Sequence, residues 1–213
     1  MSMNEIKYTE IIKSNRIARE ANAKEFFKIG LLSNLTINSF SEILAYPLLK
    51  KEINAEIEIG NYDNLIQDSI RMKDKRAVVV VWELSSMLAR LPKLVELMSS
   101  EELTVLVEDI KKDIQLLLDN LKGVPLVFFA RFSALPFTSN VFETTRIESI
   151  ADELNEFLDS NVKVNLIYFA MDKAFAEIGL SDSLDLRLYR SSRSLFTFKF
   201  LKYFSGFVSQ YIF

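Results

Sequence analysis

Seven polar residues in three short segments carry the chemistry that this sequence can offer. The first two segments come directly after apolar runs with the character of β-strands, and the third follows a short helix that comes after the last such run. A hydroxyl in such a position can attack an ester, and an arginine can hold a carboxylate or a phosphate. The candidate binding residues are Ser33, Asn34 and Thr36, then Arg131 and Asn140, then Asp185 and Arg187.

Histidine and cysteine are both absent from the 213 residues. A serine nucleophile needs an adjacent base, and histidine is the usual one. The sequence offers no such base for Ser33, so we assign no catalytic residue to this chain. The alternative is an atypical esterase that uses Ser33 together with Asp185. For the other candidates the structural alternatives are helix capping, a surface arginine and an ordinary ion pair in a loop.

The composition argues against several classes of protein. The net charge is −3, and lysine and arginine are scattered rather than gathered into a nucleic-acid surface. The longest apolar runs, residues 77–82 and 124–130, are far shorter than the ~18 residues of a membrane span. The first ten residues lack the apolar core of a signal peptide. We therefore expect a cytoplasmic protein with no membrane span and no nucleic-acid partner.

Apolar runs alternate with segments of helical periodicity, which is typical of a parallel sheet with right-handed crossovers. The second strand alternates with glutamates, as edge strands do, whereas the third and fourth are continuously apolar, as in the middle of a sheet. We predict an α/β fold, a three-layer doubly wound parallel sheet in the flavodoxin-like order 2-1-3-4-5, with a helical arm at 1–27 and the domain at 28–213. The expected strands are 28–32, 54–59, 77–82, 124–130 and 162–170. The expected helices are 4–27, 39–51, one ending at 70, 99–121, 143–158, one ending at 178, and 194–213.

Two pairs with Ser-x-x-Glu spacing predict helix starts. Ser39 with Glu42, and Ser99 with Glu102, have the spacing of a capping box. The five glycines are not clustered, and Gly30 lies inside the first strand rather than in the turn after it. A phosphate-binding loop of the dinucleotide type is therefore not expected.

The predicted strand order brings the three polar segments together. Loops after the first and fourth strands flank the switch point at which open α/β sheets bind ligands. The segment at 183–191 would close over that point, so we expect Asn34, Arg131 and Asp185 to converge on one cleft. A polar cleft there would indicate a binding domain, whereas loops filled by packing would indicate a structural or dimerisation module.

Two stretches, read together, resemble a known family. They are KIGLLSNLTINSF at 28–40 and the tail at 164–213, which contains Asp185-x-Arg187-x-Tyr189. A break near Pro92, an FxxxPF loop at 132–137 and the Leu-Asn pair at 154–155 lie between them in the same order. The chain thus resembles, from about residue 5 onward, the N-terminal SGNH (GDSL)-like domain of the FkbH-like, HAD-IIIC family. The resemblance rests on the order and spacing of these motifs, because no single motif is highly specific.

The resemblance implies the SGNH-hydrolase-like fold and a cleft, but not hydrolysis. Enzymes of that fold place Gly-Asp-Ser at the first turn, where this chain has Leu32, Ser33 and Asn34. A one-residue slip would put Ser33 rather than Asn34 at the nucleophile position. Asp185 stands near the acidic position of the family, but no histidine accompanies it.

The resemblance also implies a larger protein. Family members carry a following HAD-type phosphatase or transferase domain with an Asp-x-Asp motif and magnesium, so no cofactor is expected in this chain. They are implicated in loading a glyceryl unit onto an acyl carrier protein or in surface-polysaccharide or polyketide biosynthesis. The implied role here is a non-catalytic domain that binds substrate or carrier. The implied partners are an acyl carrier protein or sugar acceptor and the HAD domain in cis. A homodimer is a further partner that we consider, independently of the resemblance.

The last helix ends in an aromatic face and an apolar tip. We expect most of that face to bury against the sheet. Ile212 and Phe213 would stay exposed unless further protein or a second copy covered them, which favours a fragment of a longer chain.

Overall fold

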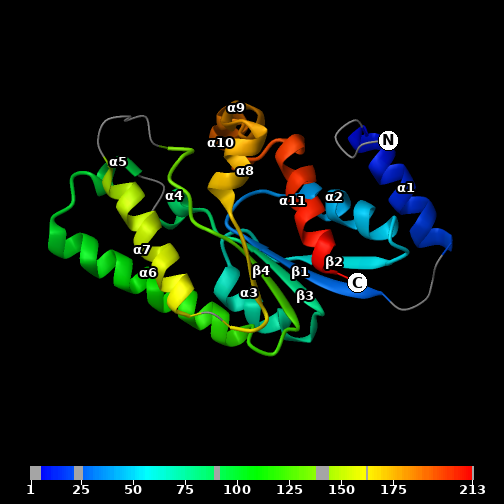
Figure 1. Ribbon diagram of the computed structural model, residues 1–213, viewed down its shortest axis with the longest axis horizontal. Helices are drawn as coiled ribbons and strands as arrows, with labels where there is room; N and C mark the ends of the chain where they lie inside the picture. The colour runs from blue at the N-terminus through cyan, green and yellow to red at the C-terminus, as the bar shows by residue number, and fades with distance from the viewer. Residues whose placement is uncertain (1–5, 22–25, 89–91, 138–143, 162, 213) are drawn as a thin grey trace.

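The computed structural model describes residues 6–21, 26–88, 92–137, 144–161 and 163–212 (Figure 1). Five parallel strands form one sheet in the order β2-β1-β3-β4-β5, as predicted. The strands are β1 (Phe27–Ser33), β2 (Ala55–Ile59), β3 (Ala77–Val81), β4 (Leu126–Ala130) and β5 (Leu166–Phe169). The helices are α1 (Tyr8–Ala21), α2 (Asn38–Leu49), α3 (Leu65–Arg71), the 3-10 helix η2 (Met72–Asp74), α4 (Leu84–Met87), α5 (Pro92–Val95), α6 (Ser100–Asn120), α7 (Arg146–Ser160), α8 (Met171–Ile178), α9 (Leu180–Ser183), α10 (Leu186–Ser192) and α11 (Phe198–Tyr211).

The middle of the sheet follows from the apolar runs. All five residues of β3 are buried, because β-branched valines pack well on both faces of a parallel strand. β3 pairs with β1 on one side and with β4 on the other. A Cβ atom at Gly30 in β1 would lie 2.8 Å from the sulfur of Met72, so a larger residue there would displace this buried side chain.

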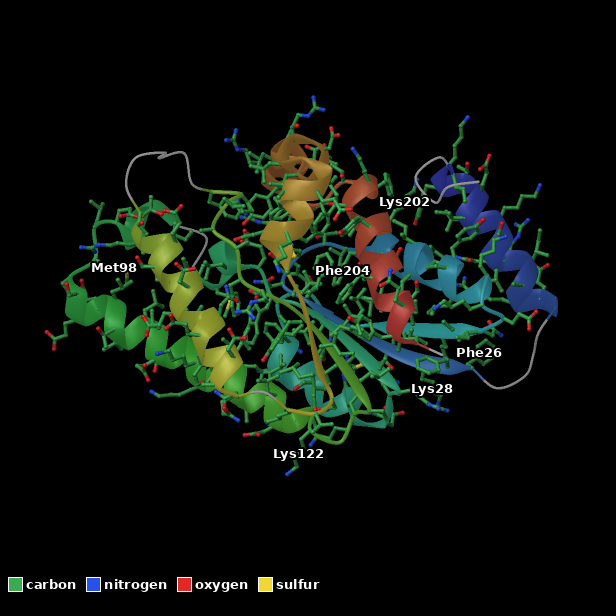
Figure 2. The ribbon with its side chains drawn as sticks, viewed as in Figure 1. Phe26, Lys28, Met98, Lys122, Lys202 and Phe204 are labelled. Carbon is green, nitrogen blue, oxygen red and sulfur yellow. The ribbon has the colours of Figure 1, made fainter. Side chains whose placement is uncertain are left out.

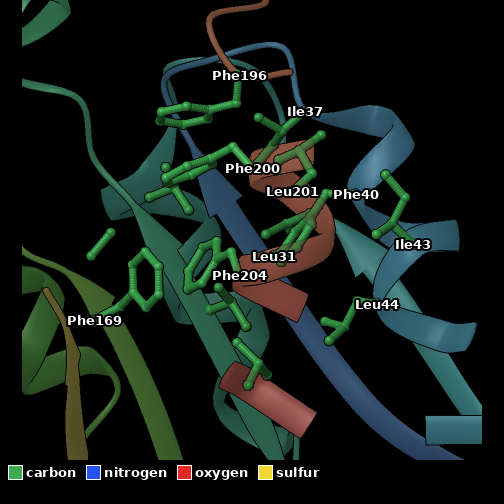
Figure 3. Close-up of a cluster of buried hydrophobic side chains, with 14 of the residues drawn as sticks. Leu31, Ile37, Phe40, Ile43, Leu44, Phe169, Phe196, Phe200, Leu201 and Phe204 are labelled. Atoms are coloured by element: carbon green, nitrogen blue, oxygen red, sulfur yellow. The ribbon is translucent and has the colours of Figure 1, made fainter. Parts of the chain in front are cut away.

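Two apolar cores lie on opposite faces of the sheet. One joins the sheet to α2, α8 and α11, and the other joins it to α3, α6 and α7. In the first core, Phe204 of α11 stacks on Phe40 of α2 and lies 4.2 Å from Phe169 of β5, measured between ring centroids (Figure 3). Phe204 thus joins α2 and the edge strand β5 in one aromatic layer.

The N-terminal arm contains the helix α1, which packs on α2 (Figure 1). Asn15 donates to the backbone carbonyl and to the carboxylate of Glu42, at 2.8 and 2.7 Å, and Arg19 pairs with the same carboxylate at 2.9 Å. Ile11 is fully buried against this layer. Glu42 therefore holds α1, and does not cap α2.

The predicted capping box at Ser39 is accordingly wrong, since α2 begins at Asn38 with no side-chain cap. The one at Ser99 is confirmed, with both reciprocal hydrogen bonds to Glu102 present. A second box, which the sequence analysis missed, starts α7 at Thr145 with Glu148. The short helix after β2 begins at Leu65 without a side-chain cap, so neither Asn61 nor Asp63 caps it.

The end of the chain differs from the prediction at its apolar tip. Ile212 is fully buried in the first core and is not exposed as predicted. It therefore gives no reason to expect a partner that covers it. Phe213 lies outside the described residues. No helix among the described ranges combines the length and the apolar character that crossing a bilayer requires.

Candidate functional site

The first turn, residues 33–37, follows β1 at the carboxyl edge of the sheet, where ligands of this fold class bind. Ser33 is only 6% exposed, and its Oγ accepts a hydrogen bond of 2.9 Å from the backbone N–H of Leu35. A hydroxyl that closes its own turn in this way is buried and oriented inward. Within the described part of the chain, Ser33 and Asp185 do not hydrogen-bond to each other.

Asn34 is fully buried and joins β1 to the end of β3. Its amide nitrogen donates to the carbonyl of Glu83, and its amide oxygen accepts from the N–H of Glu83, both at 2.7 Å. The side chain thus imitates one more backbone pair of the parallel sheet. It stabilises the turn, and both of its polar atoms bond to the backbone of Glu83 instead of lining the predicted cleft.

Asp185 caps α10, a helix in a segment for which the sequence suggested only a polar loop. Its Oδ1 accepts from the backbone N–H groups of Arg187 and Leu188 at 3.1 and 2.9 Å. Arg187 is exposed and makes no ion pair with Asp185 in the described structure. The carboxylate of Asp185 therefore bonds to the backbone N–H of Arg187 and does not pair with its guanidinium.

Tyr189 of α10 lies over this edge and is 8% exposed. Its ring packs on Phe137 with 5.5 Å between centroids, and its hydroxyl lies 3.5 Å from the carboxylate of Glu83. Arg193 then ends α10 in a left-handed conformation, at φ 59°, and its carbonyl accepts from the N–H of Thr36 at 3.0 Å. The first and third polar segments are thus adjacent, as the topology predicted.

Arg131 lines a small cavity at this edge, but its guanidinium is paired with α7. Its two terminal nitrogens each lie 2.7 Å from a carboxylate oxygen of Asp159 on α7, and its guanidinium lies over the ring of Tyr168. These hydrogen bonds from Arg131 lower the pKa of Asp159, and burial raises the pKa of Tyr168 to about 12. Arg131 therefore does not join Asn34 and Asp185 at one point, contrary to the predicted convergence. Asn140 lies outside the described residues.

A small cavity lies among the described residues at this edge. This cavity of about 20 Å³ lies between the ends of β3 and β4, with Ser133, Pro136, Leu195 and Phe196 among its walls. A site needs roughly 10–15 Å³ to hold one water molecule, so this cavity has room for a water but not for a substrate. Among the described residues, no three acidic side chains gather to form a metal site.

No protein-family model and no curated protein matches the sequence. The fold is similar to that of the N-terminal part of a Bacteroides fragilis protein containing a phosphatase domain, solved in complex with Mg, at a TM-score of 0.72 and 14% identity. The match covers 94% of this chain but 55% of the Bacteroides chain. The fold is also similar to a lipase from a goat rumen metagenome, at a TM-score of 0.63 and 10% identity, over 88% of this chain and 98% of the lipase.

These likenesses agree with the resemblance at the level of the fold. The chain has the architecture of a lipase and of the N-terminal part of a phosphatase-domain protein, and it spans about half the length of the latter.

Sequence reasoning missed how Glu83 and Tyr189 close this edge. The available signals were a single acidic residue directly after a fully apolar strand, and a tyrosine between two arginines. Neither signal predicts the hydrogen bonds between the side-chain amide of Asn34 and the backbone of Glu83, because these residues lie 49 positions apart in the sequence.

Proposed function

We propose that this chain is a non-catalytic SGNH-like domain that serves a phosphatase- or transferase-type domain of the same protein. The observation that carries the proposal is the closed first turn. The resemblance aligns either Ser33 or Asn34 with the nucleophile of the hydrolase fold, and the side chains of both are hydrogen-bonded within the domain. A serine hydroxyl without a general base is a poor nucleophile at neutral pH.

The second half of the proposal rests on the fold likeness. The Bacteroides structure contains a phosphatase domain and Mg, and this chain matches about half of it. By analogy, magnesium and the reaction belong to a domain other than this one. The analogy is one of fold and supplies no site residue.

The role that we propose is binding of the acceptor, an acyl carrier protein in preference to a free sugar. The cavity among the described residues of the carboxyl edge is too small for a sugar, which favours a protein partner. Exposed Arg187 and Arg190 on α10 add positive charge that would suit an acidic carrier. A structural or dimerisation module is the second candidate, and the same packing of the three segments supports it.

The size of the native protein tests the proposal. An antibody raised against this chain should detect, in the source cells, a species well above 24.6 kDa whose immunoprecipitate hydrolyses a phosphomonoester in the presence of magnesium. A native species of 24.6 kDa that carries no such activity would contradict the proposal. Loss of carrier binding in Arg187→Ala, Arg190→Ala protein would separate the acceptor-binding role from that of a structural module.

A further inference from the structure

A groove separates α8 from α11 on the face of the sheet that α2 and α11 cover. The two helices lie side by side in the ribbon (Figure 1), and the groove between them has a volume of about 510 Å³. Sites for small molecules commonly measure about 300–1,000 Å³. The groove is therefore large enough for a small molecule, unlike the cavity at the carboxyl edge.

The walls of the groove are aromatic and aliphatic. Phe169 of β5 contributes to its lining, with Tyr203 and Phe207 of α11 on one side and Ala174 of α8 on the other. Phe169 and Phe207 lie 5.0 Å apart between ring centroids in an edge-to-face arrangement. Aromatic surfaces of this kind bind flat rings and extended hydrocarbon chains.

Gly206 keeps the groove open. It lies in α11 and lines the groove, and a Cβ atom added to it would meet no other atom within 4 Å. A glycine inside a helix is less favourable than alanine by about 0.5–1 kcal/mol. Because no neighbouring atom requires this glycine, its effect in the present fold is to leave free space in the groove.

The rim of the groove is polar and carries one exposed cation. Lys173 is exposed, and in the described structure it forms no ion pair or hydrogen bond. Lys202 of α11, which is labelled in Figure 2, also lines the groove. Its ammonium donates a hydrogen bond of 2.6 Å to the carbonyl of Ile6. The carboxylate of Glu177 accepts from the hydroxyl of Tyr203 at 2.5 Å, and this hydrogen bond raises the pKa of Tyr203.

We propose that the groove between α8 and α11 binds a small carboxylate with an acyl or aryl body. The apolar body lies along Phe169, Phe207 and the space left at Gly206, and the carboxylate pairs with Lys173. Charge complementarity favours the anion, because two lysines, Lys173 and Lys202, and one carboxylate, Glu177, are the charged residues that line the groove. This site goes beyond the proposed function, because it concerns a small molecule and a face of the domain away from the carboxyl edge.

Titration calorimetry on the full 213-residue chain tests the site directly, with dodecanoate as the probe below its micellar concentration. We expect binding of one dodecanoate per chain. Dodecyltrimethylammonium, which has the same tail with a cationic head, should bind at least tenfold more weakly. Binding of both probes with equal affinity, or no saturable binding of dodecanoate, would overturn the proposal.

Two pairs of variants locate the site. Gly206→Leu fills the groove with a residue that favours helix, so the fold should survive and the affinity for dodecanoate should fall at least tenfold. Its control is Gly123→Leu, at a glycine that also has open space around it, for which the affinity should stay within twofold. Lys173→Gln should weaken dodecanoate binding three- to tenfold and leave dodecanol binding unchanged, whereas Lys122→Gln should change neither.

These variants distinguish a small molecule from a second copy of the chain as the occupant of the groove. Unchanged dodecanoate binding in Gly206→Leu protein with native circular dichroism would overturn the proposal. So would a dimer of the wild-type chain that dissociates in Gly206→Leu protein, because a second copy would then fill the groove. Neither result bears on the proposed function, which is tested by the size and the activity of the native protein.

Discussion

Asn34 is a structural residue in this molecule because both polar ends of its amide are bonded to one partner. The two hydrogen bonds to the backbone of Glu83 are each 2.7 Å long and lie in a fully buried region. Loss of the amide removes the hydrogen bond to the N–H of Glu83 and one of the hydrogen bonds to its carbonyl, which also accepts from the N–H of Met87 at 3.4 Å. The amide of Asn34 therefore contributes to the stability of the carboxyl edge.

We predict that Asn34→Leu, which keeps the size of the side chain but not its polarity, lowers the free energy of unfolding by about 2–4 kcal/mol. Asn38→Ala, at an exposed position four residues later, should stay within about 0.5 kcal/mol of the wild type. Urea denaturation followed by circular dichroism measures both. Equal stability of the two variants would show that the amide of Asn34 does not hold the turn.

Tyr168 should make the fold sensitive to alkaline pH. Its hydroxyl donates to the carbonyl of Leu158 at 2.6 Å, and burial raises its pKa to about 12, against about 10 for an unfolded tyrosine. Between these two values the unfolded state loses the proton first, so the contribution of Tyr168 to stability is complete below pH ~10 and is lost as the pH rises through ~12.

The measurement is urea unfolding of wild-type and Tyr168→Phe protein at pH 9 and pH 11. The variant should be less stable than the wild type at pH 9, by about 1 kcal/mol for the lost hydrogen bond, and the difference should shrink at pH 11. A difference that stays constant with pH would contradict the assignment.

At the scale of elements, two identical sequence spacings behave differently. Ser99 and Glu102 form a capping box, whereas Ser39 and Glu42 do not, because the carboxylate of Glu42 is bound to Asn15 and Arg19 of α1. Spacing alone could not separate the two, since the contact that decides the outcome comes from a helix more than twenty residues away in the sequence.

Ser99→Ala should therefore destabilise the protein by about 1 kcal/mol, and Ser39→Ala by less than about 0.5 kcal/mol. Thermal unfolding of both variants under the same conditions measures the difference. If the two substitutions had equal effects, the capping assignment from the structure would be wrong.

The packing of α1 on α2 is testable with two neighbouring isoleucines. Ile11 is fully buried, whereas Ile12 is 40% exposed. Ile11→Ala should cost about 2–5 kcal/mol of stability, and Ile12→Ala should cost about 1 kcal/mol or less. Chemical denaturation measures the stability loss of each variant. Similar losses would mean that α1 does not pack on the domain in solution.

At the scale of the whole molecule, the sequence was sufficient for the fold class and the strand order. Glutamates in β2 and four consecutive valines in β3 separate an edge strand from a central one, and the crossover rules then leave few arrangements. Short helices were harder to predict from the sequence. α9 and α10 have four and seven residues, which are too few turns to show a helical period.

The site was predicted only in part, for a physical reason. Topology brings the loops of an α/β sheet together, so the contact between Thr36 and Arg193 follows from strand order. The direction of each side chain depends on its nearest partner, and Arg131 has a carboxylate of α7 within reach. The groove beside Gly206 is equally unpredictable from the sequence, because it arises from how two helices pack.

Ester hydrolysis by the purified 213-residue chain tests most directly the central claim, that this fold is present without the hydrolase reaction. Turnover of 4-nitrophenyl acetate and of an acetylated sugar should equal the rate in buffer, and Ser33→Ala protein should give the same rate as the wild type. Turnover above the rate in buffer that disappears in Ser33→Ala protein, with circular dichroism unchanged, would contradict the account and establish Ser33 as a nucleophile.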